Sequence, residues 1–333
     1  MKKEDILSVD LIDKALSSIT FDVYDMKSSI EFLDKKELEK RPESRYLAWM
    51  IVLGALPEDK TLWGKSLYGR IQSYNQKIEY YQKPNGEFPE ILSSKVTREI
   101  VSDVKRAQTW FTNFLIAIGL QKEYAQYTEK RIIRVITIVI KEMPQCQYLQ
   151  GYDRFAAISY GISLAFSLKI GLSLLEAEAF SINLLRKIIS VNNIDSNLNH
   201  ASSIMNYFQK IDGYLRSHNP EIMQCLAKQN CGSVDFASNW CGVFFVDNHH
   251  PKSFLLIWDS IILNRGNFEE FLNALVSAHL NQVPLKSSPF EQLQAIQEYP
   301  NWDVKRIVQE AENLLIPPTF CKNSMTGILG FWI

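Results

Sequence analysis

The apolar stretch from Phe155 to Ile170 most strongly limits what this chain can fold into. A helix-breaking Pro144 stands before it, and the sequence Tyr-Leu-Gln-Gly-Tyr-Asp at residues 148–153 forms a turn that opens it. A helix that spans a bilayer needs about 20 apolar residues, which is more than this stretch offers. The stretch therefore predicts a central core helix that other elements must surround.

The rest of the chain also favours helices. Only 14 glycines and 12 prolines occur in 333 residues, so tight turns are few, and this favours long helices over a many-stranded sandwich. The β-branched run Ile132–Ile140 could pass for a buried strand, but its flanks have helical spacing, so we expect a buried helix. We predict an all-α fold in one multi-helix domain.

The chain divides into three parts by sequence. Residues 1–40 form a charged helical extension, residues 41–316 form the domain, and residues 317–333 form an apolar tail. The tail is too short to cross a membrane. Three alternatives stay open for it: disorder, docking on the domain, or the beginning of an interrupted C-terminal anchor.

Composition argues against several classes of function. Binding nucleic acid needs concentrated positive charge, but the net charge is −1 and the sequence contains no long basic run. Five cysteines without C-x-x-C spacing indicate a reducing compartment, hence a cytoplasmic location. His249 and His250 lack a second ligand cluster, so we expect no metal site, and no pairing of Ser or Cys with His suggests a hydrolase. No phosphate-binding G-x-x-x-x-G-K-[ST] loop occurs.

Two short polar motifs remain. Ile100, Asp103 and Arg106 form I-x-x-D-x-x-R within an expected helix, Lys95–Leu120. Asp103 and Arg106 are three residues apart on that helix, and taken alone they indicate a surface ion pair worth under about 1 kcal/mol. In the second motif Gln150 presents a carboxamide, which can donate and accept hydrogen bonds at once, and taken alone it indicates an ordinary helix-start turn.

Together these motifs resemble the paired signatures of the TBC family of Rab GTPase-activating proteins, I-x-x-D-x-x-R and Y-x-Q-G. The resemblance runs from about residue 45 to about residue 315 in the family's order. Its further members are core motifs: Arg45 and Trp49, then Phe236 and Trp240 on a helix that Ser233 is expected to cap, and finally Trp258 and Asp259. No fixed period of about 33–47 residues supports the alternative of an unrelated helical-repeat scaffold.

The resemblance implies an all-α TBC domain that is not itself an enzyme but supplies catalytic groups in trans. Arg106 would be an arginine finger and Gln150 a glutamine finger, with Asp103 orienting Arg106. Ile100 completes the first motif, whereas Tyr148, Gly151 and Asp153 would shape the turn of Gln150. GTP and Mg²⁺ would belong to the partner Rab, so the chain needs no cofactor of its own. The alternative is a non-catalytic Rab-binding or scaffold TBC protein, whose mark would be a missing finger.

Two details refine the resemblance. Residues 148–152 look most similar to the endoplasmic-reticulum-associated subgroup, which implies Rabs of endoplasmic-reticulum-to-Golgi transport, membrane contact through the tail, and a location peripheral to those membranes. Ala107 stands where the family usually has Thr, which puts the local support of the arginine in doubt.

Overall fold

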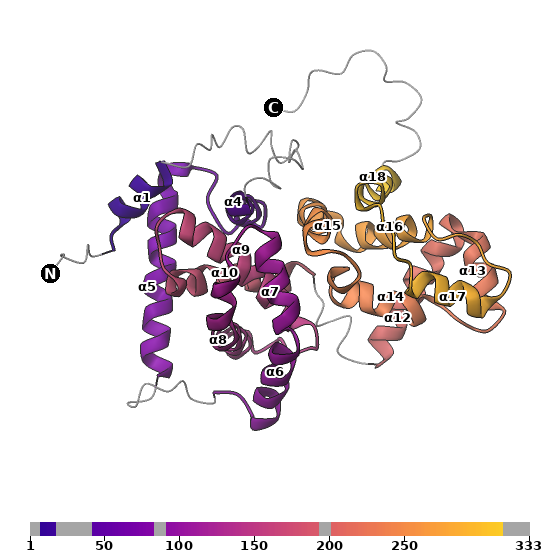
Figure 1. The fold of residues 1–333 in the computed structure, drawn as a ribbon, viewed down its shortest axis with the longest axis horizontal. Helices are drawn as coiled ribbons and strands as arrows, with labels where there is room; N and C mark the ends of the chain where they lie inside the picture. The colour runs from indigo at the N-terminus through magenta and orange to yellow at the C-terminus, as the bar shows by residue number, and fades with distance from the viewer. Residues whose placement is uncertain (1–6, 18–41, 83–90, 193–200, 316–333) are drawn as a thin grey trace, which may run out of the picture. The chain divides into compact units, whose positions relative to one another are not determined.

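The computed structural model describes residues 7–17, 42–82, 91–192 and 201–315 (Figure 1). The apolar tail, Cys321 and most of the N-terminal extension lie outside the described residues. Across these ranges the chain forms fifteen α-helices and four short 3-10 helices, with no strand, which confirms the all-α prediction. In the described part of the chain, no helix combines the length and apolar character that crossing a membrane requires.

The chain packs as two units. Unit 1 comprises residues up to 203 together with 250–255, and unit 2 comprises residues 204–249 and those from 256 onwards. The helices up to residue 192 are α1 (Val9–Ser17), α4 (Pro42–Val52), α5 (Trp63–Tyr81), α6 (Ser94–Arg106), α7 (Gln108–Ala117), α8 (Thr128–Glu142), α9 (Tyr152–Lys169) and α10 (Leu174–Asn192).

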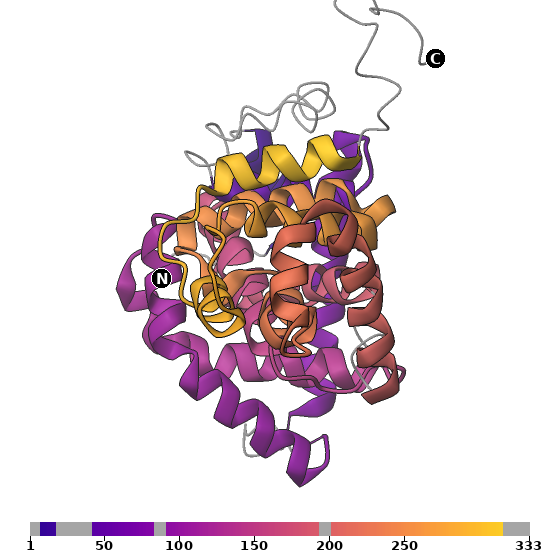
Figure 2. The same cartoon turned by 90° about the vertical axis from the view of Figure 1, so that its right-hand side faces the viewer.

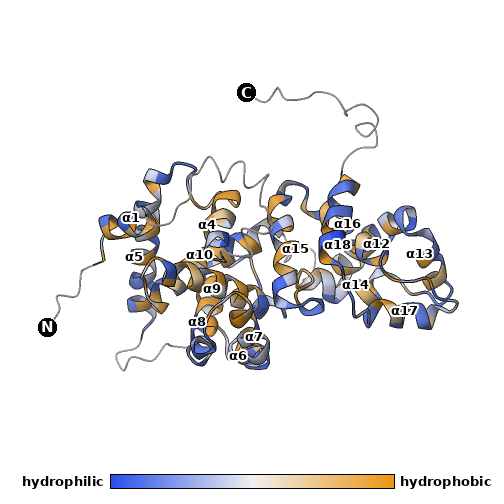
Figure 3. Cartoon of the chain, turned by 45° about the horizontal axis from the view of Figure 1, so that its top comes forward, coloured by the Kyte–Doolittle hydropathy of each residue, from blue (hydrophilic) through white to orange (hydrophobic). Residues whose placement is uncertain are grey.

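Helix α9 is the centre of unit 1. Every residue of α9 from Tyr152 to Ser167 except Arg154 is buried, and α9 packs against α4, α7, α8 and α10. Figure 3 shows the apolar character of α9. The prediction of a central core helix is thus confirmed, and so is the helical state of the β-branched run, which lies in α8.

The remaining helices are α12 (Ala201–His218), α13 (Pro220–Ala227), α14 (Ser233–Gly242), α15 (Pro251–Leu263), α16 (Phe268–Leu280), α17 (Pro289–Gln297) and α18 (Val304–Leu315). In unit 2, α16 packs against α18 and α13 against α17 (Figure 2). The core of this unit is aromatic: the ring of Trp240 lies 5.7 Å from that of Phe236 and 5.8 Å from that of Trp302.

The expected single helix over residues 95–120 is wrong. The structure has two helices, α6 and α7, separated by the single turn residue Ala107. Helical i→i−4 hydrogen bonds still cross this junction, from Ala107 N–H to the Asp103 carbonyl (3.0 Å) and from Phe111 N–H to the Ala107 carbonyl (2.8 Å). Helix α6 packs mainly against α8, whereas α7 packs against α9 and the 3-10 helix η2 (Lys122–Tyr127). Neither Gly nor Pro occurs at this junction, so the local sequence does not predict it. The two helices separate there because they pack against different neighbours.

The expected cap at Ser233 is also wrong. Gly232 is the N-cap of α14, and its N–H donates to the Asp235 carboxylate (2.8 Å). The Ser233 hydroxyl instead donates to the Phe208 carbonyl (3.0 Å), because the side chain is buried and needs an acceptor there.

Candidate functional site

Helix α6 places the first motif with one buried face. Ser93 caps the helix by accepting a hydrogen bond from Val96 N–H (3.4 Å). Ile100, Asp103 and Val104 follow at helical spacing, and all three are buried. Arg106 is the last residue of α6, where the negative end of the helix dipole favours a cation.

Asp103 connects the two motifs. One carboxylate oxygen accepts a hydrogen bond from the Arg106 guanidinium, and the other accepts one from the Tyr148 hydroxyl at 2.9 Å. The Asp103 side chain is 10% exposed, whereas that of Arg106 is 67% exposed. A buried carboxylate therefore holds one edge of an exposed guanidinium and leaves the remaining donors open to a partner. This arrangement is more than an ordinary surface ion pair.

Tyr148 acts as a fixed donor in this arrangement. Burial raises the pKa of its phenol, and the negative charges of Asp153 and Asp103 raise it further. The hydroxyl therefore stays protonated at neutral pH, and it donates a hydrogen bond to the Asp103 carboxylate. The edge of the Tyr148 ring also meets Tyr152 at the start of α9, with centroids 6.0 Å apart. Tyr148 thus joins the turn before α9 to the end of α6.

The backbone at Gly151 positions Gln150. Gly151 is the N-cap of α9 and has φ 105° and ψ −18°, a left-handed conformation that side chains other than glycine adopt at a cost. Its N–H donates to Asp153 Oδ1 (3.2 Å), and Asp153 is buried in the first turn of α9. Gln150 itself is exposed, directly before this fixed residue.

Sequence reasoning missed Arg154 and Trp110. Arg154 Nη1 donates to the second Asp153 oxygen at 2.7 Å, and its guanidinium carbon lies 5.2 Å from the centre of the Trp110 ring on α7. A cation above an aromatic face is attracted to it. The start of α9 is thereby connected to α7 as well as to α6, through a contact between residues 44 positions apart that no spacing rule indicates.

The predicted residues thus fall into separate groups. Asp103, Arg106 and Tyr148 form one hydrogen-bonded set, and the turn with Gly151 and Asp153 follows Tyr148 directly; Ile100 supports α6 from the buried side. The other candidates are all buried. Arg45 and Trp49 lie in the core of unit 1 on α4, and Phe236, Trp240, Trp258 and Asp259 lie in the helices α14 and α15.

The half-buried His249 pairs with the fully buried His279. Its Nε2 lies 2.9 Å from Nε2 of His279, and Nδ1 of His279 lies 2.7 Å from the Leu275 carbonyl. A carbonyl can only accept, so the Nδ1–H of His279 donates to Leu275 and the Nε2 of His279 is an acceptor. The Nε2–H of His249 therefore donates a hydrogen bond to the Nε2 of His279. Burial lowers the pKa of His249 to about 4. Among the described residues, no group of three or more His, Cys, Asp or Glu is placed to hold a metal ion.

Comparison with known proteins identifies a family. The sequence model described as the Rab-GTPase-TBC domain matches residues 42–283, a range that includes both polar motifs. Among solved structures, the chain is similar to the crystal structure of the Ypt/Rab-GAP domain of Gyp1p, with a TM-score of 0.67 and 15% identity, covering 92% of this chain and 98% of that chain. At this identity the likeness shows a shared fold alone. No curated protein sequence matches the chain.

Proposed function

The chain belongs to the Rab-GTPase-TBC domain family, and on that basis we propose that it accelerates GTP hydrolysis by a Rab GTPase through Arg106 and Gln150. The single observation that carries this proposal is the double role of Asp103, which binds Arg106 on α6 and Tyr148 in the segment that leads to Gln150. A scaffold without catalytic function would not require an exposed arginine that is connected by hydrogen bonds to the turn carrying an exposed glutamine.

Arg106 supplies positive charge in trans. GTP hydrolysis passes through a loose transition state whose negative charge is spread over the transferring phosphoryl group and the leaving oxygen. An arginine finger that neutralises this charge accelerates hydrolysis by about 10³–10⁵, equivalent to roughly 4–7 kcal/mol. The exposed guanidinium of Arg106 is available for that purpose, while Asp103 limits the directions in which it can point.

Gln150 orients the attacking water. Its carboxamide can accept a hydrogen bond from the water through oxygen and donate one to an oxyanion through nitrogen. Since Gly151 and Asp153 fix the backbone that follows, the carboxamide begins from a defined position. The chain thus contributes two groups of different chemistry, whereas the partner Rab holds GTP and Mg²⁺.

We place the chain in the endoplasmic-reticulum-associated subgroup of the family. The tyrosine that follows Gly151 supports this assignment. The proposed substrates are then Rabs of endoplasmic-reticulum-to-Golgi transport, and the proposed location is the cytoplasmic face of those membranes, with the apolar residues 317–333 as the contact.

The test is single-turnover GTP hydrolysis by a panel of purified Rabs with the wild-type chain, Arg106→Ala and Gln150→Ala. The matched control is Arg98→Ala, because Arg98 is an exposed arginine on the same helix whose side chain donates to the Ser94 carbonyl (3.1 Å). We expect acceleration of one or two Rabs by wild type and the control, and its loss in both finger variants.

Acceleration that survives Arg106→Ala would refute the mechanism, even with the family assignment intact. Binding of a Rab without any acceleration would favour the scaffold alternative. Acceleration only of Rabs from other transport steps would refute the subgroup assignment.

A further inference from the structure

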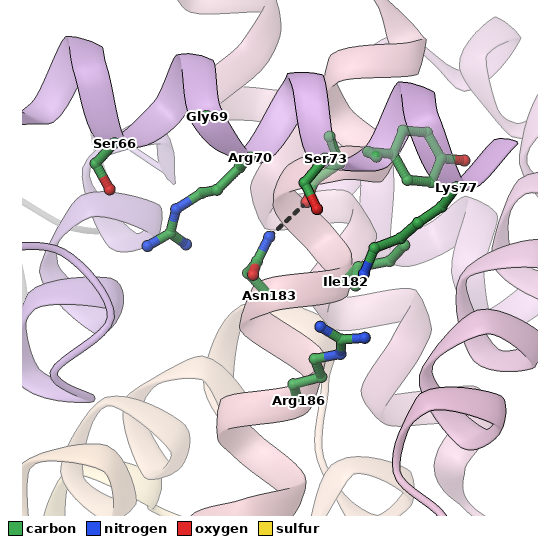
Figure 4. A pocket seen from close by; sticks show the side chains of 10 residues that line it. Ser66, Gly69, Arg70, Ser73, Lys77, Ile182, Asn183 and Arg186 are labelled. Carbon is green, nitrogen blue, oxygen red and sulfur yellow. Dashed lines mark hydrogen bonds between the residues drawn. The ribbon is translucent and has the colours of Figure 1, made fainter. Parts of the chain in front are cut away.

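A cavity of about 270 Å³ lies between α5 and α10 in unit 1. Figure 4 shows side chains from the two helices facing one another across it. The polar side chains that line it are Ser66, Arg70, Ser73, Tyr74 and Lys77 on α5, and Asn183 and Arg186 on α10. None of them belongs to the set formed by Asp103, Arg106 and Tyr148. The Tyr74 hydroxyl donates to the buried carboxylate of Glu178.

The cavity has an excess of positive charge. Lys77 Nζ and the Arg186 guanidinium both bind the same carboxylate, Glu142, with Lys77 at 2.7 Å. Arg70 instead donates to the backbone carbonyl of Ala55 and has no carboxylate partner among the described residues. Three cations less one carboxylate leave a charge of about +2, and a phosphate monoester carries about −1.5 to −2 at neutral pH.

These cations are held at an electrostatic cost. Burial lowers the pKa of Lys77, and the nearby charge of Arg186 lowers it further. Burial also lowers the pKa of Arg186, whose Nε–H is buried without a hydrogen-bond acceptor in the described structure. An anion in the cavity would relieve the repulsion and offer acceptors to these donors.

We propose that this cavity binds a phosphate monoester, either a soluble phosphorylated compound or the phosphorylated headgroup of a lipid. Arginine presents a planar set of donors that suits phosphate, and lysine adds a compact charge. The hydroxyls of Ser66 and Ser73 supply neutral donors at the cavity wall. The side chains of Lys77 and Arg186 are 24% and 27% exposed, so a ligand can reach them from solvent.

The experiment uses the full chain and two probes. Inositol trisphosphate is titrated by calorimetry, and vesicles of phosphatidylcholine with and without phosphatidylinositol bisphosphate are tested by co-sedimentation. Lys77→Gln and Arg186→Gln should each weaken binding by about tenfold or more. Glu142→Gln should strengthen it, because it removes the competing carboxylate. Lys65→Gln is the matched control, since Lys65 is an exposed lysine on α5 that does not line the cavity.

Binding of both probes that follows this pattern supports a lipid headgroup, and binding of the soluble probe alone supports a soluble compound. The proposal is overturned if wild type binds neither probe. It is also overturned if Lys65→Gln weakens binding as much as Lys77→Gln, or if Glu142→Gln weakens it. The opposite sign expected for Glu142→Gln keeps the test decisive even if Arg186→Gln fails to fold. GTPase activation is not the readout, so failure here leaves the proposed activation untouched.

Discussion

The segments that carry Arg106 and Gln150 are positioned in different ways. Arg106 is charged, ends a helix, and is held by the side chain of Asp103. Gln150 is neutral, lies in a turn, and precedes Gly151, whose backbone conformation sets its place. A charged group needs a fixed counter-charge that still leaves it accessible, whereas an amide can be placed by the backbone alone. The two segments therefore predict different responses to substitution.

The largest effect is expected from removing the charge itself. Arg106→Ala should reduce the accelerated rate by about 10³ or more, since charge neutralisation is the main contribution of such a finger. Gln150→Ala removes one oriented polar group and should cost about 10²–10³. Single-turnover hydrolysis with a responsive Rab measures both. A smaller loss for Arg106→Ala than for Gln150→Ala would reverse the comparison.

The next effect concerns the counter-charge. Asp103→Asn keeps the size of the side chain but removes the charge, and hydrogen bonds to charged groups contribute about 1.5–3 kcal/mol. We expect the maximal rate of activated GTP hydrolysis to fall by about ten- to a hundredfold. The concentration of the chain that gives the half-maximal rate should change little. Glu99→Gln, an exposed carboxylate on the same helix, is the control. A rise in the half-maximal concentration alone would mean that Asp103 serves Rab binding rather than orientation.

The backbone of the second segment is tested by Gly151→Ala. A non-glycine residue at φ 105° is strained, and such strain costs about 1–3 kcal/mol. The free energy of unfolding in urea should fall by this amount, together with activated hydrolysis. Gly69→Ala is the matched control, because Gly69 lies within helix α5 with open space around its added Cβ, and it should leave stability unchanged or raised. Equal effects of the two substitutions would contradict a special role for Gly151.

The smallest effect is expected from removing the hydrogen bond that joins the segment of Gln150 to the helix of Arg106. Tyr148→Phe removes the hydroxyl that donates to Asp103 at 2.9 Å while keeping the ring against Tyr152. The free energy of unfolding should fall by about 1 kcal/mol, and the activated rate by a few-fold. Tyr127→Phe changes an exposed tyrosine and serves as the control. An unchanged rate would show that the two segments are positioned independently.

The sequence predicts those parts of the structure that depend on local pattern. The apolar run in α9 and the helical β-branched run in α8 follow from periodicity and from helix-breaking residues. The break at Ala107 does not, because packing of α6 and α7 against different neighbours causes it.

The same limit applies to the candidate site. The pair of Asp103 and Arg106 follows from helical spacing, but the bond from Tyr148 to Asp103 joins residues 45 positions apart. The placement of Arg154 over Trp110 is likewise a tertiary contact. Both need the three-dimensional arrangement of α6, α7 and α9, which no local pattern contains.

The histidine pair of unit 2 makes the stability of the fold depend on pH. His249 donates to His279 in this pair, and folding lowers the pKa of His249 from 6.5 to about 4 because burial disfavours the charged form of its ring. The stabilising effect is therefore complete above about pH 6.5 and is lost as the pH falls towards 4, at up to about 1.4 kcal/mol per pH unit for each histidine. Urea unfolding at neutral and mildly acidic pH, with His249→Gln for comparison, measures this loss. A wild-type stability that does not fall with acidification would contradict it. In a cell, such a protein would persist in neutral surroundings and unfold more readily wherever the medium turns acidic.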